Sequence, residues 1–157
     1  MNFRSCKTRL YKEDTAMVQL IVGKKGKGKT KYLLEKVNSE IKEASGNFVY
    51  LDKSSKHMYE LNNKIRLIDV SAFPLKNSDE FVGFVCGIIS QDHDLEKMFL
   101  DSFMKLSHLE DSPEQTFSCI QQLKDISEKF QVEIIISISM DKEELSSELQ
   151  DDIQISL

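Results

Sequence analysis

Residues 17–30 read Met-Val-Gln-Leu-Ile-Val-Gly-Lys-Lys-Gly-Lys-Gly-Lys-Thr. The first part of this stretch, 17–22, is apolar except for Gln19, which is typical of a strand buried on both faces of a sheet. Only glycine, lysine and a final threonine fill residues 23–30, and the apolar residues of 31–41 then recur at helical spacing. A buried strand, a glycine-rich loop and a helix in this order predict the start of an α/β fold.

Residues 23–30 match the pattern G-x-x-x-x-G-K-[ST] in full, between the predicted strand and helix. The glycines let backbone N–H groups turn inward toward a phosphate, and the positive end of the following helix adds to the attraction. In this pattern the lysine reaches the β- and γ-phosphates and the hydroxyl binds Mg²⁺, roles that fall on Lys29 and Thr30. The residues expected to contact a nucleotide are Gly23, Lys24, Lys25, Gly26, Lys27, Gly28, Lys29, Thr30 and Lys31.

Strand and helix patterns alternate along the rest of the chain. Further strands are predicted at 47–52, 65–70, 98–101, 132–139 and 153–157. Helical patterns fall between them at 54–61, 78–89, 113–130 and 141–148, the second with Ser78 as its N-cap. This alternation predicts a three-layer α/β/α sandwich around a mainly parallel sheet of about five or six strands. Its ligand should lie at the carboxyl ends of the strands.

The chain is expected to form one domain. Its 157 residues, of which 40% are hydrophobic and 30% charged, are enough for one core and too few for two. Residues 17–157 are therefore predicted to be a single nucleotide-binding domain. Residues 1–16 mix basic and acidic side chains without the apolar region of a signal peptide, and they could form a disordered N-terminal arm.

The composition argues against several classes of partner. The net charge of −5 gives no general attraction to nucleic acid or to an anionic membrane. The longest apolar stretch, 81–89, is about half the roughly 20 residues that span a bilayer, so no membrane segment is expected. Cys6, Cys86 and Cys119 are widely spaced and form no C-x-x-C pair, which favours reduced thiols in the cytoplasm.

A Mg²⁺ ion bound with a nucleotide needs a carboxylate at the end of a neighbouring strand. Two aspartates stand at such positions: Asp101 follows Met-Phe-Leu, and Asp69 follows residues 65–68. The uninterrupted apolar run before Asp101 favours a central strand beside the glycine-rich loop. Asp101 is therefore the preferred metal partner of Thr30, with Asp69 as the alternative.

Residues 99–103, Phe-Leu-Asp-Ser-Phe, extend a resemblance to the RecA and KaiC class of phosphate-loop ATPases, which covers residues 17–140. The resemblance implies a RecA-like sheet and Mg²⁺-dependent hydrolysis of ATP. The class keeps a water-polarising glutamate where this chain has Asp52, one methylene shorter. It keeps a polar γ-phosphate sensor where Ser137 or Ser139 would stand, and Ser139 joins the expected nucleotide-binding residues. The chain also resembles short bacterial phosphate-loop ATP-binding proteins.

ATP is the expected nucleotide, because the nearest match to the guanine-reading N-K-x-D motif, residues 63–66, ends in arginine. We expect a slow ATPase, or one that is activated by a protein partner or by assembly with further copies, with Lys29 and Asp52 as catalytic residues. A nucleotide-dependent interaction module without turnover is one alternative. Another is a small-molecule kinase with its acceptor under residues 71–78, although three arginines in the whole chain are few for clamping two substrates.

Overall fold

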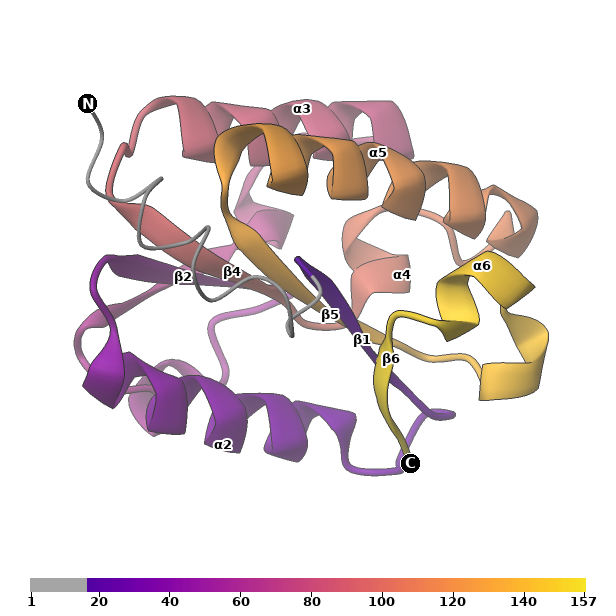
Figure 1. Ribbon diagram of the computed structural model, residues 1–157, viewed down its shortest axis with the longest axis horizontal. Helices are drawn as coiled ribbons and strands as arrows, with labels where there is room; N and C mark the ends of the chain where they lie inside the picture. The colour runs from indigo at the N-terminus through magenta and orange to yellow at the C-terminus, as the bar shows by residue number, and fades with distance from the viewer. Residues whose placement is uncertain (1–16) are drawn as a thin grey trace.

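The computed structural model describes residues 17–157, and the arm predicted at 1–16 lies outside the described residues. Six strands form one open sheet in which all paired neighbours are parallel, in the order β3-β2-β4-β5-β1-β6 (Figure 1). The α/β class and the parallel sheet predicted from the sequence are therefore confirmed. The strands are β1 (Val18–Val22), β2 (Asn47–Asp52), β3 (Ile65–Asp69), β4 (Leu95–Leu100), β5 (Glu133–Ile138) and β6 (Ile153–Ser156).

Helical segments connect the strands. The α-helices are α2 (Lys29–Glu40), α3 (Ser78–Ser90), α4 (Phe103–Leu106), α5 (Thr116–Phe130) and α6 (Ser147–Gln150). The short 3₁₀ helices are η1 (Ile41–Glu43), η2 (Met58–Glu60), η3 (Val70–Ala72), η4 (Pro113–Gln115) and η5 (Lys142–Glu144). Across residues 17–157, each helix is too short or too polar to cross a bilayer.

The helices gather around the sheet, with α2 on one side of it and α3 and α5 on the other (Figure 1). Alternate residues of the central strands enter two different cores. Ile135 packs in the core that contains α2, whereas Ile134 and Ile136 pack in the core that contains α3 and α5. Burial on both faces explains why the centre of β5 is apolar at every position.

Two local predictions about helices are wrong. Of the helix expected at 54–61, only the single 3₁₀ turn η2 forms. The Ser54 hydroxyl accepts a hydrogen bond from the Lys56 N–H, a local contact that competes with helix formation. Helix α3 is capped by Asn77 and not by Ser78, because the Asn77 side-chain oxygen accepts from the Glu80 N–H at 2.8 Å.

Strand β4 differs from its prediction in length and in place. It begins at Leu95 and not at residue 98, because the charged Lys97 is accommodated within the sheet by ion pairs to Glu40 at 2.7 Å and Glu133 at 3.1 Å. The sequence also predicts that the strand before Asp101, which is β4, lies beside the glycine-rich loop that follows β1. Strand β5 lies between β4 and β1 instead, so a side chain at the end of β4 reaches the loop across the end of β5.

Candidate functional site

The glycine-rich loop, residues 23–30, follows β1 at the carboxyl edge of the sheet and leads directly into α2. Gly26 and Gly28 have φ angles of 88° and 89°, the left-handed region that side chains rarely adopt. Gly28 is also the N-cap of α2, and among the described residues no side chain caps this end of the helix. The first N–H groups of α2 and the positive end of its dipole thus lie next to the loop, an arrangement that attracts anions.

A cavity of about 370 Å³ opens between this loop and the segments that follow β2, β4 and β5. Its location is the one expected for the ligand of a parallel sheet, at the carboxyl ends of the strands. The loop contributes two ammonium groups and a hydroxyl, and the neighbouring segments add two carboxylates, two further lysines and three serines. The lining residues are Lys25, Gly26, Gly28, Lys29, Thr30, Lys53, Asp101, Ser102, Met104, Lys105, Glu110, Ser137 and Ser139.

Asp101 is the centre of a buried network of hydroxyl groups at the floor of this cavity. The carboxylate is only 2% exposed. Its Oδ1 accepts from the Thr30 hydroxyl at 3.1 Å and from the Ser137 hydroxyl at 3.0 Å, and its Oδ2 accepts from the Tyr50 hydroxyl at 2.7 Å. The three donors come from α2, β5 and β2, so the network joins three elements that are remote in the sequence. They compensate for part of the cost of removing a carboxylate from water.

The chain turns sharply after Asp101. Ser102 has a φ of 60°, an uncommon conformation for a residue other than glycine. Its N–H donates to the Ser137 hydroxyl oxygen at 2.9 Å, while the Ser137 hydroxyl itself donates to Asp101. Ser137 therefore fixes both the carboxylate and the turn that follows it.

Lys29 is an ammonium group with little access to water, since its residue is 8% exposed. Its Nζ donates to the Lys24 carbonyl oxygen at 3.0 Å. Burial lowers the pKa of Lys29, and the nearby negative charge of Asp101 opposes that shift. An anion bound in the loop would act in the same sense as Asp101 and would favour the protonated lysine.

The structure brings Thr30 together with Asp101 and not with Asp69. Strand β3, which ends at Asp69, is separated from β4 by β2, a distance of about 10 Å across the sheet. The Asp69 carboxylate instead accepts from the N–H and the hydroxyl of Ser71 and caps η3. Between the two candidates, only Asp101 contacts Thr30.

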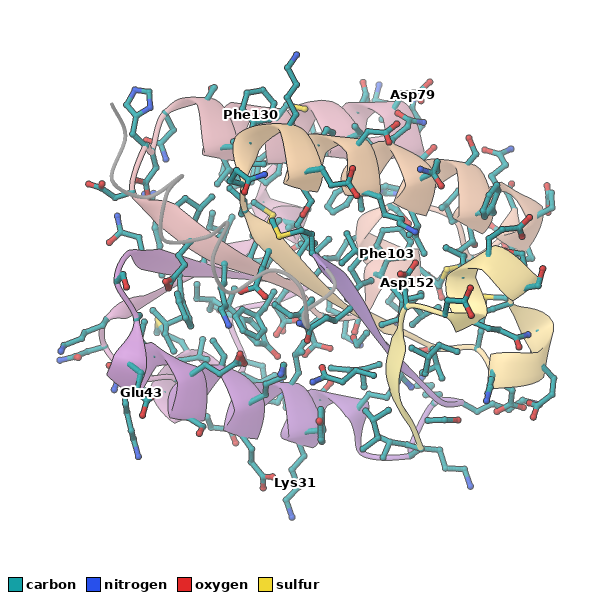
Figure 2. The ribbon with its side chains drawn as sticks, viewed as in Figure 1. Lys31, Glu43, Asp79, Phe103, Phe130 and Asp152 are labelled. Carbon is teal, nitrogen blue, oxygen red and sulfur yellow. The ribbon has the colours of Figure 1, made fainter. Side chains whose placement is uncertain are left out.

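The nucleotide-binding residues predicted from the sequence divide into two groups. Those that line the cavity are Lys25, Gly26, Gly28, Lys29, Thr30 and Ser139. Those that do not line it are Gly23, Lys24, Lys27 and Lys31. Lys24 forms an ion pair with Asp141 at 3.4 Å, and Lys31 points away from the body of the protein on the outer side of α2 (Figure 2). Residues 71–78, expected to cover an acceptor, also contribute nothing to the cavity lining.

Asp52 lies beside Asp101 because Leu51 and Leu100, the residues before them, are paired in register. It is 2% exposed and does not line the cavity, although the next residue, Lys53, does. Its Oδ1 accepts from the Lys53 N–H at 2.7 Å, whereas its Oδ2 is buried without a hydrogen-bond partner in residues 17–157. Burial raises the pKa of Asp52, and the negative charge of Asp101 raises it further.

The raised pKa of Asp52 predicts a pH-dependent cost to stability. A carboxyl group with a raised folded-state pKa ionises less readily in the folded state than in the unfolded state. Its contribution to stability is therefore fully present below the ordinary pKa of 3.8, and it is lost as the pH rises through the folded-state pKa. The Asp52→Asn variant stays neutral, so at pH 7 its free energy of unfolding should exceed that of the wild type. Urea unfolding at several pH values measures the difference, which should shrink toward pH 4.

The exposed Asp111 offers a matched control, because Asp111→Asn makes the same chemical change outside the core. Its effect on the free energy of unfolding should be small at every pH. A difference between Asp52→Asn and the wild type that is the same at pH 4 and pH 7 would contradict the raised pKa.

Several site residues could not be identified from the sequence. Tyr50 reaches Asp101 only because β2 and β4 pair with Tyr50 opposite Phe99, a register that no local pattern reveals. Lys53, Lys105 and Glu110 lie on connecting segments, where charged residues are common for other reasons. Among these residues, Lys53 alone has a sequence feature that indicates a site residue, because it directly follows the predicted strand 47–52.

Comparison of the sequence with models of protein families gives no match, and comparison with curated proteins gives no significant match. The candidate site therefore rests on its sequence pattern and its geometry.

Proposed function

We propose that this protein binds ATP with Mg²⁺ in the cavity beside the glycine-rich loop, and that it is a slow or partner-activated ATPase. The observation that carries the proposal is the hydrogen bond of 3.1 Å between Thr30 and Asp101. The two residues are far apart in the sequence, and they meet where a glycine-rich loop, a helix N-terminus and a buried lysine also converge. ATP is preferred to GTP because residues 63–66 lack the guanine-reading aspartate.

The fold is consistent with this function. The placement of α2 on one side of the parallel sheet, with α3 and α5 on the other, supports the inference of a three-layer α/β/α sandwich of the RecA-like type (Figure 1). Asp52 is the last residue of β2, Ser137 lies near the end of β5 and Ser139 follows that strand, and these locations support the roles that the resemblance to the RecA and KaiC class implies. A cytoplasmic location, expected from the cysteine pattern, is part of the same proposal.

The residues at the floor of the cavity suit Mg²⁺. Its preferred ligands are oxygen atoms, and it is usually held by one or two protein groups together with phosphates and water. The Thr30 hydroxyl and the Asp101 carboxylate provide such oxygens beside the loop. Within residues 17–157 no cluster of three or more histidine, cysteine or acidic side chains could hold a metal alone, so the nucleotide's phosphates would have to complete the coordination. When bound, the ion would neutralise charge on the phosphates.

The roles of the remaining residues follow from where they lie. The loop N–H groups and the Lys29 ammonium would hold the phosphates, and charge-assisted hydrogen bonds in a site with little water make these contacts strong. Ser139, exposed at the end of β5, would meet the γ-phosphate side of the cavity. Ser137 would keep Asp101 in place.

Turnover would require Asp52 to move. A group that orients the attacking water must reach it by a hydrogen bond, and Asp52 is buried, held by the Lys53 N–H and outside the cavity lining. Rearrangement of the segment after β2, on assembly or on partner binding, would bring the carboxylate to the cavity. This geometry supports slow intrinsic hydrolysis, and it also favours the second candidate, a nucleotide-dependent interaction module without turnover.

One experiment tests the proposal and separates the two candidates. The melting temperature of the full chain is measured with ATP, with Mg²⁺ and with both, and phosphate release is followed in parallel. Binding predicts a rise in melting temperature that grows with ATP concentration, because a ligand of the native state stabilises it by mass action. Stabilisation with phosphate release indicates an ATPase, and stabilisation without release indicates the interaction module. The absence of any stabilisation at millimolar ATP and Mg²⁺ would refute nucleotide binding.

A further inference from the structure

Tyr50 is the one member of the buried network that lies entirely behind the cavity. It is 0% exposed and is not a lining residue, whereas Thr30, Asp101 and Ser137 all line the cavity. In β2 it pairs in register with Phe99 of β4, which precedes Asp101 by two residues and therefore shares its face of the sheet. The Tyr50 ring stacks on the Phe99 ring, with centroids 6.3 Å apart, and this contact directs the hydroxyl along β4 to the Asp101 Oδ2, 2.7 Å away.

The two oxygens of Asp101 differ in how many donors they accept. An ionised carboxylate offers about two acceptor positions on each oxygen. Among residues 17–157, Oδ1 accepts from two hydroxyls, those of Thr30 and Ser137, whereas Oδ2 accepts from Tyr50 alone. Within the described part of the chain, Asp101 forms no ion pair closer than 4.0 Å, so hydroxyl groups alone orient it. Of the side chains that the structure describes, Tyr50 is thus the one donor that fixes Oδ2.

A Mg²⁺ ion would change the role of one of these donors. The Thr30 hydroxyl oxygen would become a ligand of the ion, so its contact with Asp101 would no longer be the main restraint on the carboxylate. Ser137 would continue to restrain Oδ1, and Tyr50 would restrain Oδ2. Both are fully buried and fixed by strands of the sheet.

We propose that Tyr50 is a positioning residue, which holds the Asp101 carboxylate in the orientation that receives the hydrated Mg²⁺ of a bound nucleotide. This inference rests on the proposed function. Partners that orient a metal-binding group typically change metal affinity by about 10- to 100-fold when they are removed. Loss of the Tyr50 hydroxyl should therefore weaken the response to Mg²⁺ and leave the contacts of the loop with the phosphates in place.

The test uses Tyr50→Phe, which keeps the ring that stacks on Phe99 and removes only the hydroxyl. The affinity of the full chain for a non-hydrolysable ATP analogue is measured in EDTA and in saturating Mg²⁺, and the ratio of the two dissociation constants gives the coupling between nucleotide and metal. In Tyr50→Phe this coupling should fall by about 10- to 100-fold, with the affinity in EDTA unchanged. Tyr59→Phe is the matched control, because Tyr59 is 92% exposed and should keep wild-type coupling.

The outcomes separate this inference from the proposed function. A wild-type protein that does not bind the analogue, or that binds it without help from Mg²⁺, would refute the proposed function. A wild type with strong coupling and a Tyr50→Phe variant with equal coupling would overturn the role of Tyr50 alone. A decrease in affinity that is equal in EDTA and in Mg²⁺ would also overturn it, because that result indicates a general structural effect.

A second measurement covers the case in which Tyr50→Phe does not fold. The chain contains no tryptophan and four tyrosines, so replacing the three others with phenylalanine leaves Tyr50 as the only tyrosine emitter. Addition of Mg²⁺ to this protein, saturated with the analogue, should change the Tyr50 fluorescence in step with Mg²⁺ binding. Metal binding without any change in that signal would overturn the proposal.

Discussion

Replacement of Lys29 with alanine is expected to abolish the stabilisation of this protein by ATP and Mg²⁺. Lys29 is 8% exposed, its pKa is lowered by burial, and it lies within electrostatic reach of Asp101. A phosphate contact at such a site forms with little competition from water. Removing one partner of a buried, charged hydrogen bond costs about 2–5 kcal/mol, so the affinity for ATP should fall by about 30-fold or more.

Thermal shift and calorimetric titration with ATP and Mg²⁺ measure this loss. Lys42→Ala is the control, because it removes the same charge from an exposed position in η1, beyond the far end of α2. In the absence of ligand, both variants should melt close to the wild type, since within residues 17–157 the Lys29 ammonium has only a backbone carbonyl as its hydrogen-bond partner. If Lys29→Ala bound ATP as tightly as Lys42→Ala, the assignment of the phosphate site would be wrong.

The second large effect is expected at Asp101. Asp101→Asn keeps an oxygen that can accept from Thr30 and Ser137, and its new amide can donate to the Tyr50 oxygen, so the fold should be preserved. The negative charge is lost, however, and Mg²⁺ binds weakly to a neutral amide in place of a carboxylate. We expect the strengthening of ATP binding by Mg²⁺ to disappear and any phosphate release to fall by about 100-fold or more.

The matched variant Asp69→Asn decides between the two carboxylates that the sequence left open. Asp69 contacts Ser71 and lies two strands away from β4, so this variant should bind ATP and Mg²⁺ as the wild type does. The ratio of ATP affinities with and without Mg²⁺ is the measurement. If Mg²⁺ no longer strengthened ATP binding in Asp69→Asn but still did so in Asp101→Asn, the metal would lie beside Asp69 and not beside Asp101.

The parts of the fold that were predictable are those with strong local patterns. The apolar runs of β1 and β5 identified strands buried on both faces, and the glycine-rich residues 23–30 located the turn between β1 and α2. The apolar residues before Asp101 favour it over Asp69 as the metal partner of Thr30, and the structure places its carboxylate within 3.1 Å of the Thr30 hydroxyl. The predicted place of its strand directly beside the loop is wrong, since β5 lies between β4 and β1.

The parts that were not predictable depend on contacts between distant segments. Lys97 interrupts the apolar pattern of β4, and only its ion pairs with Glu40 and Glu133 show how it enters the sheet. From the sequence, Tyr50 is an ordinary aromatic residue of a buried strand. Only the register between β2 and β4 shows that its hydroxyl contacts Asp101. Burial of Asp52 likewise follows from packing, because a strand-end aspartate is usually expected to face solvent.

The position of β1 between β5 and β6 also determines when the candidate site can form during synthesis of the chain. Val18 pairs with Ile134 and Leu20 with Ile153, so β1 leaves the ribosome long before either of its partners exists. Strands β2, β3 and β4 can pair with one another earlier, because their partners are closer in the sequence. The glycine-rich loop would then be the last part of the site to become ordered. An anion that binds the ordered loop would stabilise the state in which β1 is inserted between β5 and β6, relative to the state in which β1 is unpaired.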